Sequence, residues 1–177
     1  MWLTVAGRGS NFDQVVDAAT SIGAAQRRAV PLAGMTLAAA ILVVVQMAVG
    51  MVVNLYVTVP SHHPGAKPTD YFTGSLHSVA WAIGSGPVAL AIHASIGLAL
   101  VLAALALAVR AVAARTGWVA FTSVLAAALV IGAGFNGASF LDFGFNVSSL
   151  VMALLALGAL TCYLVSGYLL ASRTIRR

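Results

Sequence analysis

Charged residues are scarce in this sequence. Only 7% of its 177 residues are charged, and only four are acidic. Soluble domains carry about 25% charged residues, whereas this chain is 61% hydrophobic and has a mean hydropathy of +1.01. The scarcity of charge excludes a water-soluble globular domain. It predicts an all-α integral membrane protein, a helical bundle in lipid.

Cysteine is almost absent as well. Cys162 is the single thiol and lies in an apolar run, so no intrachain disulfide and no redox pair of cysteines can form. This excludes the thiol–disulfide membrane oxidoreductases. The sequence also has no HExxH motif, no GxSxG motif and no pair of membrane aspartates, so nothing favours a hydrolase. The polar first residues argue against a cleavable signal peptide, and the first apolar helix is expected to direct insertion.

Long apolar runs dominate what is present. Each is close to the roughly 20 residues that a helix needs to cross a bilayer, and they cover 31–53, 87–109, 118–135 and 147–170. Pro31 and Pro87 stand at first-turn positions, where the missing N–H carries no penalty. The runs predict one four-transmembrane-helix bundle over 30–171. Its connections are 54–86, 110–117 and 136–146, and a basic tail follows at 172–177.

Positive charge is segregated to one side of these runs. Of the nine Lys and Arg residues, only Lys67 falls in the 54–86 connection. An excess of Lys and Arg marks the cytoplasmic side. The prediction is therefore an N-in, C-in, multi-pass protein of a bacterial-type plasma membrane, with the histidine-bearing loops outside. The basic residues form no patch, so they indicate topology and contact with the lipid bilayer rather than nucleic-acid binding. Those flanking the runs on the inner side are Arg8, Arg27, Arg28, Arg110, Arg115, Arg173, Arg176 and Arg177.

Two further helices are expected outside the spans. Residues 1–29 form a cytoplasmic segment whose apolar residues recur at helical spacing from Phe12 to Ile22. This pattern predicts an amphipathic interfacial helix on the inner surface, and a partly disordered tail is the alternative. In the 54–86 loop, the apolar residues of 71–83 share one helical face, and Trp81 suits the membrane interface. This pattern predicts a short outer-surface helix.

His93 is the residue that most strongly suggests a site. It lies near the start of the second run, roughly 9 Å along the helix, which places an ionisable side chain in the outer leaflet and makes it a functional candidate. Gly97, one turn away on the same face, leaves space for a flat macrocycle or for another helix. Gln46 and Asn54 share a polar stripe on the first helix and are candidate neighbours. Ordinary packing, with His93 hydrogen-bonded to Gln46, Asn54 or Ser149, is the alternative.

One hypothesis for this pocket is a single b-type haem. His93 would be one axial ligand. In its helix number, its size and its glycine-lined helix with a histidine, the chain loosely resembles the four-helix membrane b-type cytochromes. It departs from them because the third and fourth runs contain no histidine, so no family is assigned and at most one haem is expected. The candidates for the second ligand are His77, His62, His63, Met51 and Met152.

A second hypothesis is a metal site at the outer surface. Imidazoles and a carboxylate suit zinc or copper(II), although their spacing here matches no strict motif. The candidate ligands are His62, His63, His77, His93 and Asp70. Asp142, the only acid of the 136–146 connection, is expected either to orient a histidine or to lie solvated at the surface.

These patterns leave different functions open. The first is electron transfer at the His93 pocket, with haem b or a quinone bound and a histidine accepting a proton. The alternative is a non-catalytic accessory subunit of a larger, respiratory-type membrane complex, which docks through its 54–86 loop. Transport, alone or as a homo-oligomer, is disfavoured because polar residues stop in the outer half of the helices. Whether the chain is an enzyme stays open.

Overall fold

The fold is described from a computed structural model of the chain. It describes the backbone of residues 9–175 and the side chains of 14–16 and 31–172. Within that part of the chain every regular element is an α-helix, and no strand occurs. The helices are α1 (Gly9–Tyr56), α2 (Tyr71–Gly84), α3 (Val88–Ala113), α4 (Trp118–Phe143) and α5 (Asn146–Ile175).

Four of these helices are long and apolar enough to cross a membrane, which confirms the predicted number. The candidate spans among the described residues are Pro31–Tyr56, Val88–Ala113, Trp118–Phe143 and Asn146–Ser172. All four extend past the predicted C-terminal ends. The largest error lies in the third span, because the predicted loop at 136–146 is mostly helix. Only Gly144 and Phe145 separate α4 from α5.

The continuation of α4 has a local physical reason. The amide of Asn136, expected at the end of the helix, donates to the Gly132 carbonyl one turn back at 2.9 Å, so it is satisfied inside the helix. The helix ends eight residues later at Gly144, whose φ of +70° suits a residue without a side chain. Its N–H donates to the Phe140 carbonyl at 2.9 Å. Glycine at the turn therefore ends α4, and the polar residues before it do not.

The first helix also differs from expectation. The sequence predicts a separate segment at 1–29 and a span that begins at Pro31, whereas α1 runs unbroken from Gly9 to Tyr56 with Pro31 in its interior. Proline lacks the N–H that an interior helical position uses, so one backbone bond is missing there. The amphipathic face of 1–29 and the basic tail at 172–177 fall almost wholly on side chains outside the described set. Their membrane locations stay predictions.

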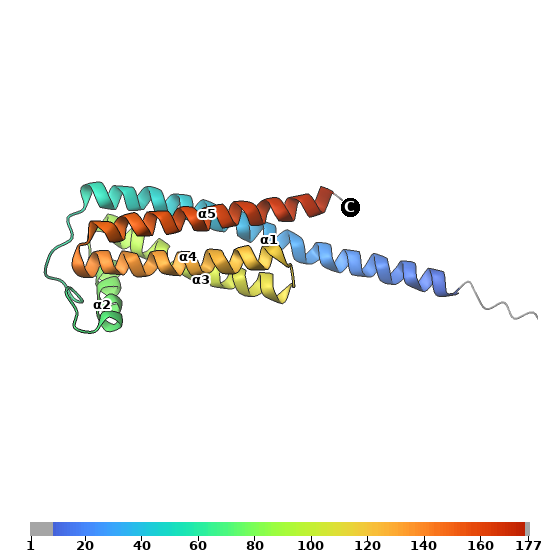
Figure 1. Cartoon of the computed structure of the whole chain (residues 1–177), viewed down its shortest axis with the longest axis horizontal. Helices are drawn as coiled ribbons and strands as arrows, with labels where there is room; N and C mark the ends of the chain where they lie inside the picture. Colours follow the sequence, from blue (N-terminus) through green and yellow to red (C-terminus); the bar gives the residue numbers. More distant parts are fainter. Residues whose placement is uncertain (1–8, 176–177) are drawn as a thin grey trace, which may run out of the picture.

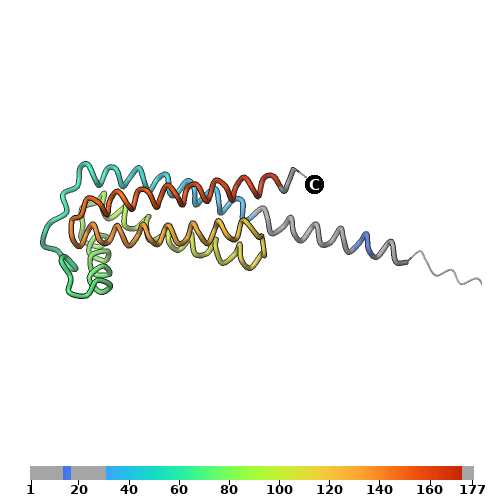
Figure 2. Tube along the Cα trace, in the orientation of Figure 1, coloured from blue at the N-terminus to red at the C-terminus, as the bar shows by residue number. Residues whose placement is uncertain are grey.

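The four long helices form a four-sided bundle (Figure 1). Helix α1 packs against α3 and α5, and α4 packs against the same two helices, so each long helix has two neighbours. The tube in Figure 2 shows the four spans running side by side. Small and branched residues let the helices approach closely in the centre. Fully buried members of this core are Val43, Ala104, Ala111, Val119, Ala126 and Ala159.

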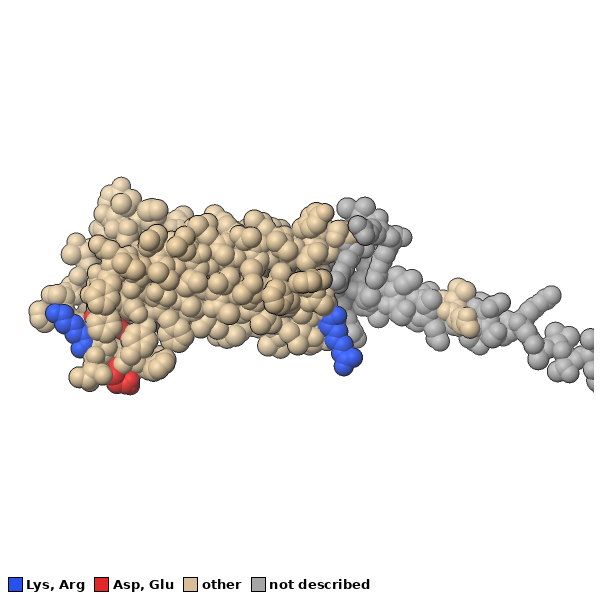
Figure 3. Space-filling view, in the orientation of Figure 1, with Lys and Arg blue, Asp and Glu red and all other residues tan. Residues whose placement is uncertain are grey.

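Helix α2 lies across one end of the bundle and roughly perpendicular to it (Figure 1). We call the structure formed by residues 57–84 the cap, and this end of the bundle the cap end. Helix α2 packs on α3 and α4, which confirms the short helix predicted at 71–83. Asp70 caps its N-terminus and accepts a hydrogen bond from the backbone N–H of Thr73 at 3.5 Å. The charged side chains on the face drawn in Figure 3 lie at the two ends of the bundle.

Candidate functional site

His93 of α3 pairs with Gln46 of α1 across the bundle interior. The Gln46 side-chain amide lies 3.2 Å from His93 Nε2 and also donates to the His93 backbone carbonyl at 3.1 Å. Both amide hydrogens are therefore used on one residue of the neighbouring helix. This is the hydrogen-bonded packing alternative, with Gln46 as the partner of the histidine.

Two glycines make this pairing possible, because the His93 ring lies against the backbone of Gly50 and the Gln46 amide lies against that of Gly97. A β-carbon at Gly50 would lie 2.8 Å from Cε1 of the His93 ring, which is closer than real contacts allow. A β-carbon at Gly97 would lie 3.0 Å from the Gln46 amide nitrogen. The space that the sequence suggests beside the imidazole is thus occupied by the partner helix and by the amide.

Two polar atoms of this pair have no hydrogen-bond partner among the described residues. His93 Nδ1 and Gln46 Oε1 are both buried and unpaired. Because the Gln46 amide donates to Nε2, the proton of the neutral ring belongs on Nδ1. The pair then leaves one donor and one acceptor unsatisfied at a depth where unsatisfied polar groups are costly.

The other residues expected around His93 face elsewhere. Asn54 is exposed, and its side-chain oxygen accepts a hydrogen bond from the Ser149 hydroxyl of α5 at 3.3 Å. Met152 packs against α4, where a β-carbon at Gly137 would lie 3.2 Å from its sulfur. His77 is exposed on α2, and α2 packs on α3 and α4 but not on α1. Of the residues expected around His93, the structure places Gln46 against its ring, with Gly97 against the Gln46 amide.

A haem does not fit the observed contacts of His93. An axial imidazole needs a free ring nitrogen that faces room for the macrocycle. Here Nε2 is bonded to Gln46, while Nδ1 is buried near Gly50. In this arrangement neither ring nitrogen of His93 is placed to bind a haem iron. Haem b remains a hypothesis from the sequence, and a spectrum tests it.

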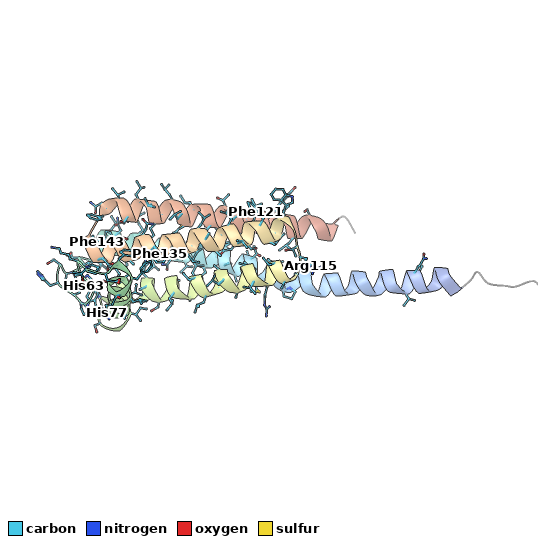
Figure 4. The ribbon with its side chains drawn as sticks, turned by 60° about the horizontal axis from the view of Figure 1, so that its bottom comes forward. His63, His77, Arg115, Phe121, Phe135 and Phe143 are labelled. Carbon is cyan, nitrogen blue, oxygen red and sulfur yellow. The ribbon has the colours of Figure 1, made fainter. Side chains whose placement is uncertain are left out.

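The cap holds a second cluster, centred on His63. Its ring stacks on Trp81 of α2, with centroids 4.3 Å apart and planes inclined by 13°. Its two ring nitrogens reach two carbonyl oxygens, Nδ1 that of Pro64 at 3.0 Å and Nε2 that of Leu141 at 3.2 Å. His63 thus joins the loop to α2 and to the end of α4. Figure 4 labels it at the cap end, with Arg115 at the opposite end.

Asp142 lies beneath the same loop and is only 2% exposed. Its Oδ2 accepts a hydrogen bond from the Ser75 hydroxyl at 2.8 Å, whereas Oδ1 is buried and has no partner in the part of the chain that the structure describes. Its backbone carbonyl accepts from the Lys67 N–H at 2.9 Å. A solvated position at the surface, one of its two expected roles, is therefore wrong. Ser75, rather than a histidine, is the group bonded to the carboxyl.

The proposed metal ligands are dispersed. Within the described residues, no three His, Cys, Asp or Glu side chains form a group able to hold a metal ion. His62 is exposed and pairs with the adjacent Ser61 hydroxyl at 3.0 Å. The Asp70 carboxylate accepts hydrogen bonds from the backbone N–H and the hydroxyl of Thr73 at the start of α2. His77 appears at the cap end in Figure 4 but belongs to the exposed side of α2.

Some residues that hold the cap against the bundle were not identified from the sequence. The Tyr71 hydroxyl donates to the Phe135 carbonyl at 2.9 Å and also lies 2.8 Å from the Ser139 hydroxyl of α4. The buried face of α2 consists of the small residues Gly74, Ser75, Ser78 and Ala82. Their recurrence at helical spacing was a usable signal, because small residues permit close helix packing.

Comparison of the chain with protein-family models, curated proteins and solved structures finds no match.

Proposed function

We propose that this chain is a non-catalytic subunit that docks, through its cap, onto a larger membrane complex. One observation carries the proposal: the polar side chains that suggest a reaction centre are bonded to one another between elements of this chain. His93 pairs with Gln46, and Asp142 pairs with Ser75. The aromatic hydroxyl of Tyr71 likewise fastens α2 to α4. Side chains that are hydrogen-bonded between helices in this way stabilise the packing of the bundle and its cap.

The outward side of α2 supports docking. Its small residues face the bundle, so its large apolar side chains point away: Phe72 is 66% exposed and Leu76 is 71% exposed. Phe72 meets Phe135 of α4 edge to face, with centroids 6.0 Å apart, which extends the apolar surface beyond α2. We call Phe72, Leu76, Ile83 and Phe135 the cap patch. Exposed apolar patches of this kind mark sites of protein or membrane contact.

The low charge of the cap favours its burial against a protein over its exposure to water. The whole 54–86 region carries only two charged side chains, Lys67 and Asp70. Interface centres are depleted in charge and enriched in aromatic residues. The partner that suits the cap patch is another multi-span membrane protein, which presents an apolar, aromatic surface at the same depth. Arg110 and Arg115, exposed at the far end, support placing the cap outside a bacterial-type plasma membrane, with both termini inside.

Site-specific photo-crosslinking in native membranes tests this proposal. A photo-reactive amino acid replaces Phe72 in the cap patch. As a matched control it replaces Leu105, an exposed residue of α3 away from the cap. We expect one protein adduct of defined mass from position 72, identified as a multi-span membrane protein, and only lipid adducts from position 105. We also expect Phe72→Ser to lower co-purification of that same partner. Lipid adducts at both positions would contradict the docking role.

The unpaired atoms of the His93–Gln46 pair favour a second candidate. A hydroxyl group can accept from Nδ1–H and donate to an oxygen such as Gln46 Oε1, so a quinol hydroxyl has the required chemistry. The pair would then serve as a quinone-binding site once α1 moves away from the ring, because in the structure Gly50 lies against the imidazole. Quinone content of the purified protein tests this candidate. Retention of about one quinone per chain, lost in Gln46→Leu, would favour it over the accessory role.

A further inference from the structure

Asp142 is a buried acid whose carboxyl has no charged partner among the described residues. Its side chain is 2% exposed, and within the same part of the chain its Oδ1 accepts no hydrogen bond. Lys67 contacts Asp142 through its backbone N–H, while the Lys67 side chain is exposed. His63 of the loop bonds to the Leu141 carbonyl rather than to the carboxyl. Because buried carboxylates in proteins are paired or coordinate a metal ion, Oδ1 requires a positive partner.

Hydroxyl and carbonyl oxygens of α2 and the loop gather beside this carboxyl. The Ser75 hydroxyl donates to Oδ2 at 2.8 Å, and Ser78, one turn further along α2, is fully buried. The 57–70 loop approaches the same turn of α2 at Gly65, where a β-carbon would overlap the Gly74 carbonyl and the Ser78 hydroxyl. The φ of Gly65 is +92°, so this close approach depends on glycine.

Such a set of oxygen atoms suits a hard cation. Hard cations bind carboxylate, carbonyl and other neutral oxygen atoms, whereas the zinc and copper sites considered above rely on histidine or cysteine. One carboxylate balances one positive charge, and a divalent ion would leave an uncompensated charge in a buried place. The close approach of the loop to α2 favours Na⁺ over the larger K⁺.

We infer that the cap binds one Na⁺ ion at Asp142, through the carboxylate Oδ1, the hydroxyls of Ser75 and Ser78, and the carbonyl oxygen of Gly65. These oxygens belong to α4, to α2 and to the 57–70 loop, so the ion joins all three elements. Na⁺ therefore holds the loop closed over the end of α4, and loss of the ion releases it. This role is additional to docking and requires no partner protein.

Hydrogen exchange of the full-length chain in detergent tests the site. The probe is the Lys67 N–H, which donates to the Asp142 carbonyl at 2.9 Å and exchanges when the loop opens. NaCl replaces choline chloride at one pH and at constant ionic strength. A ligand that binds only the closed loop slows its opening in proportion to ligand concentration, so we expect about tenfold slower exchange for each tenfold rise in Na⁺ above the dissociation constant.

Asp142→Asn and Asp70→Asn form a matched pair for this test. Asparagine at position 142 can still accept from Ser75 but carries no charge, so we expect its exchange to become insensitive to Na⁺. Asparagine at position 70 removes an exposed acid of the cap and still caps α2, so we expect the Na⁺ response to remain.

Three results would overturn the inference. The wild-type chain alone is decisive if NaCl and choline chloride give the same exchange at Lys67, because no ion then holds the loop. A Na⁺ response that persists in Asp142→Asn would remove the carboxylate from the site. An equal slowing by KCl would overturn the assignment to Na⁺. All of these measurements use the isolated chain, so failure of the docking proposal leaves them unaffected.

Discussion

Gly50 of α1 lies directly against the imidazole of His93, and a β-carbon at this position would stand 2.8 Å from Cε1 of the ring. The α1–α3 interface therefore depends on a missing side chain as well as on a hydrogen bond. Glycine is the residue that lets the first helix approach the ring. The histidine is thus enclosed by its own bundle, which is the basis of the structural role argued for it.

Gly50→Ala should destabilise the bundle. The added methyl group must displace the His93 ring or the helix, and overpacking of this kind costs about 1–3 kcal/mol. Gly34 of the same helix is the matched control, because a β-carbon there meets nothing within 4 Å. Reversible SDS unfolding would measure both variants. Equal stability of Gly50→Ala and Gly34→Ala would contradict the close packing of the histidine.

The energetic coupling between Gln46 and His93 can be measured by a double-mutant cycle with Gln46→Leu and His93→Leu. Interhelical hydrogen bonds in membranes contribute about 0.6–2 kcal/mol, and we expect a coupling energy in that range. As a control, Gln46→Leu combined with Ser166→Ala should be additive, because Ser166 bonds Thr122 at 2.6 Å between α4 and α5. Additivity of the Gln46 and His93 variants would mean that the pair makes no net contribution.

Tyr71→Phe should loosen α2 without unfolding the four spans. The variant removes the hydroxyl that contacts the Phe135 carbonyl and the Ser139 side chain. Loss of one such bond costs about 0.5–1.5 kcal/mol. Proteolysis within the loop should therefore accelerate, while the helical circular-dichroism signal stays the same. Tyr56→Phe, at a side chain that is 81% exposed near the same end, should leave proteolysis unchanged.

Ser75→Ala should destabilise the cap through Asp142. The serine hydroxyl is the group that donates to this buried carboxyl, and a buried acceptor left without a partner costs about 1–3 kcal/mol. Ser95→Ala, at an exposed position of α3, provides the control. Thermal denaturation of both variants in one detergent checks the difference. A larger loss of stability in Ser95→Ala than in Ser75→Ala would show that the hydrogen bond from Ser75 to Asp142 does not stabilise the cap.

Much of the fold follows from hydropathy alone. Four runs near span length predicted four long helices, and the apolar face of 71–83 predicted α2. The third span was predicted to end at 135, before the Gly- and Phe-rich stretch 136–146. In the structure the Asn136 amide bonds within α4, and Gly137 fits against Met152. Periodicity describes one helix at a time. It does not show which neighbour will satisfy a polar group.

The candidate site was likewise predictable where it depends on one helix and unpredictable where it depends on how helices pack together. Gln46 was one of the named partners of His93, because glutamine on a polar stripe needs an interhelical acceptor or donor. The role of Gly50 as a contact surface for the ring could not be predicted, because it depends on the register of α1 against α3. The burial of Asp142 was likewise missed. It results from the 57–70 loop folding over the end of α4, a long-range contact that no local pattern encodes.

The most direct test of the account is the visible spectrum of the purified wild-type protein, oxidised and dithionite-reduced, with metal analysis on the same sample. If the polar groups of the bundle serve to bond its helices, the protein should be colourless and free of stoichiometric haem, zinc or copper. A reduced α-band of b-haem type that disappears in His93→Ala would contradict this account, because it would require the His93 ring to leave Gln46 for a cofactor.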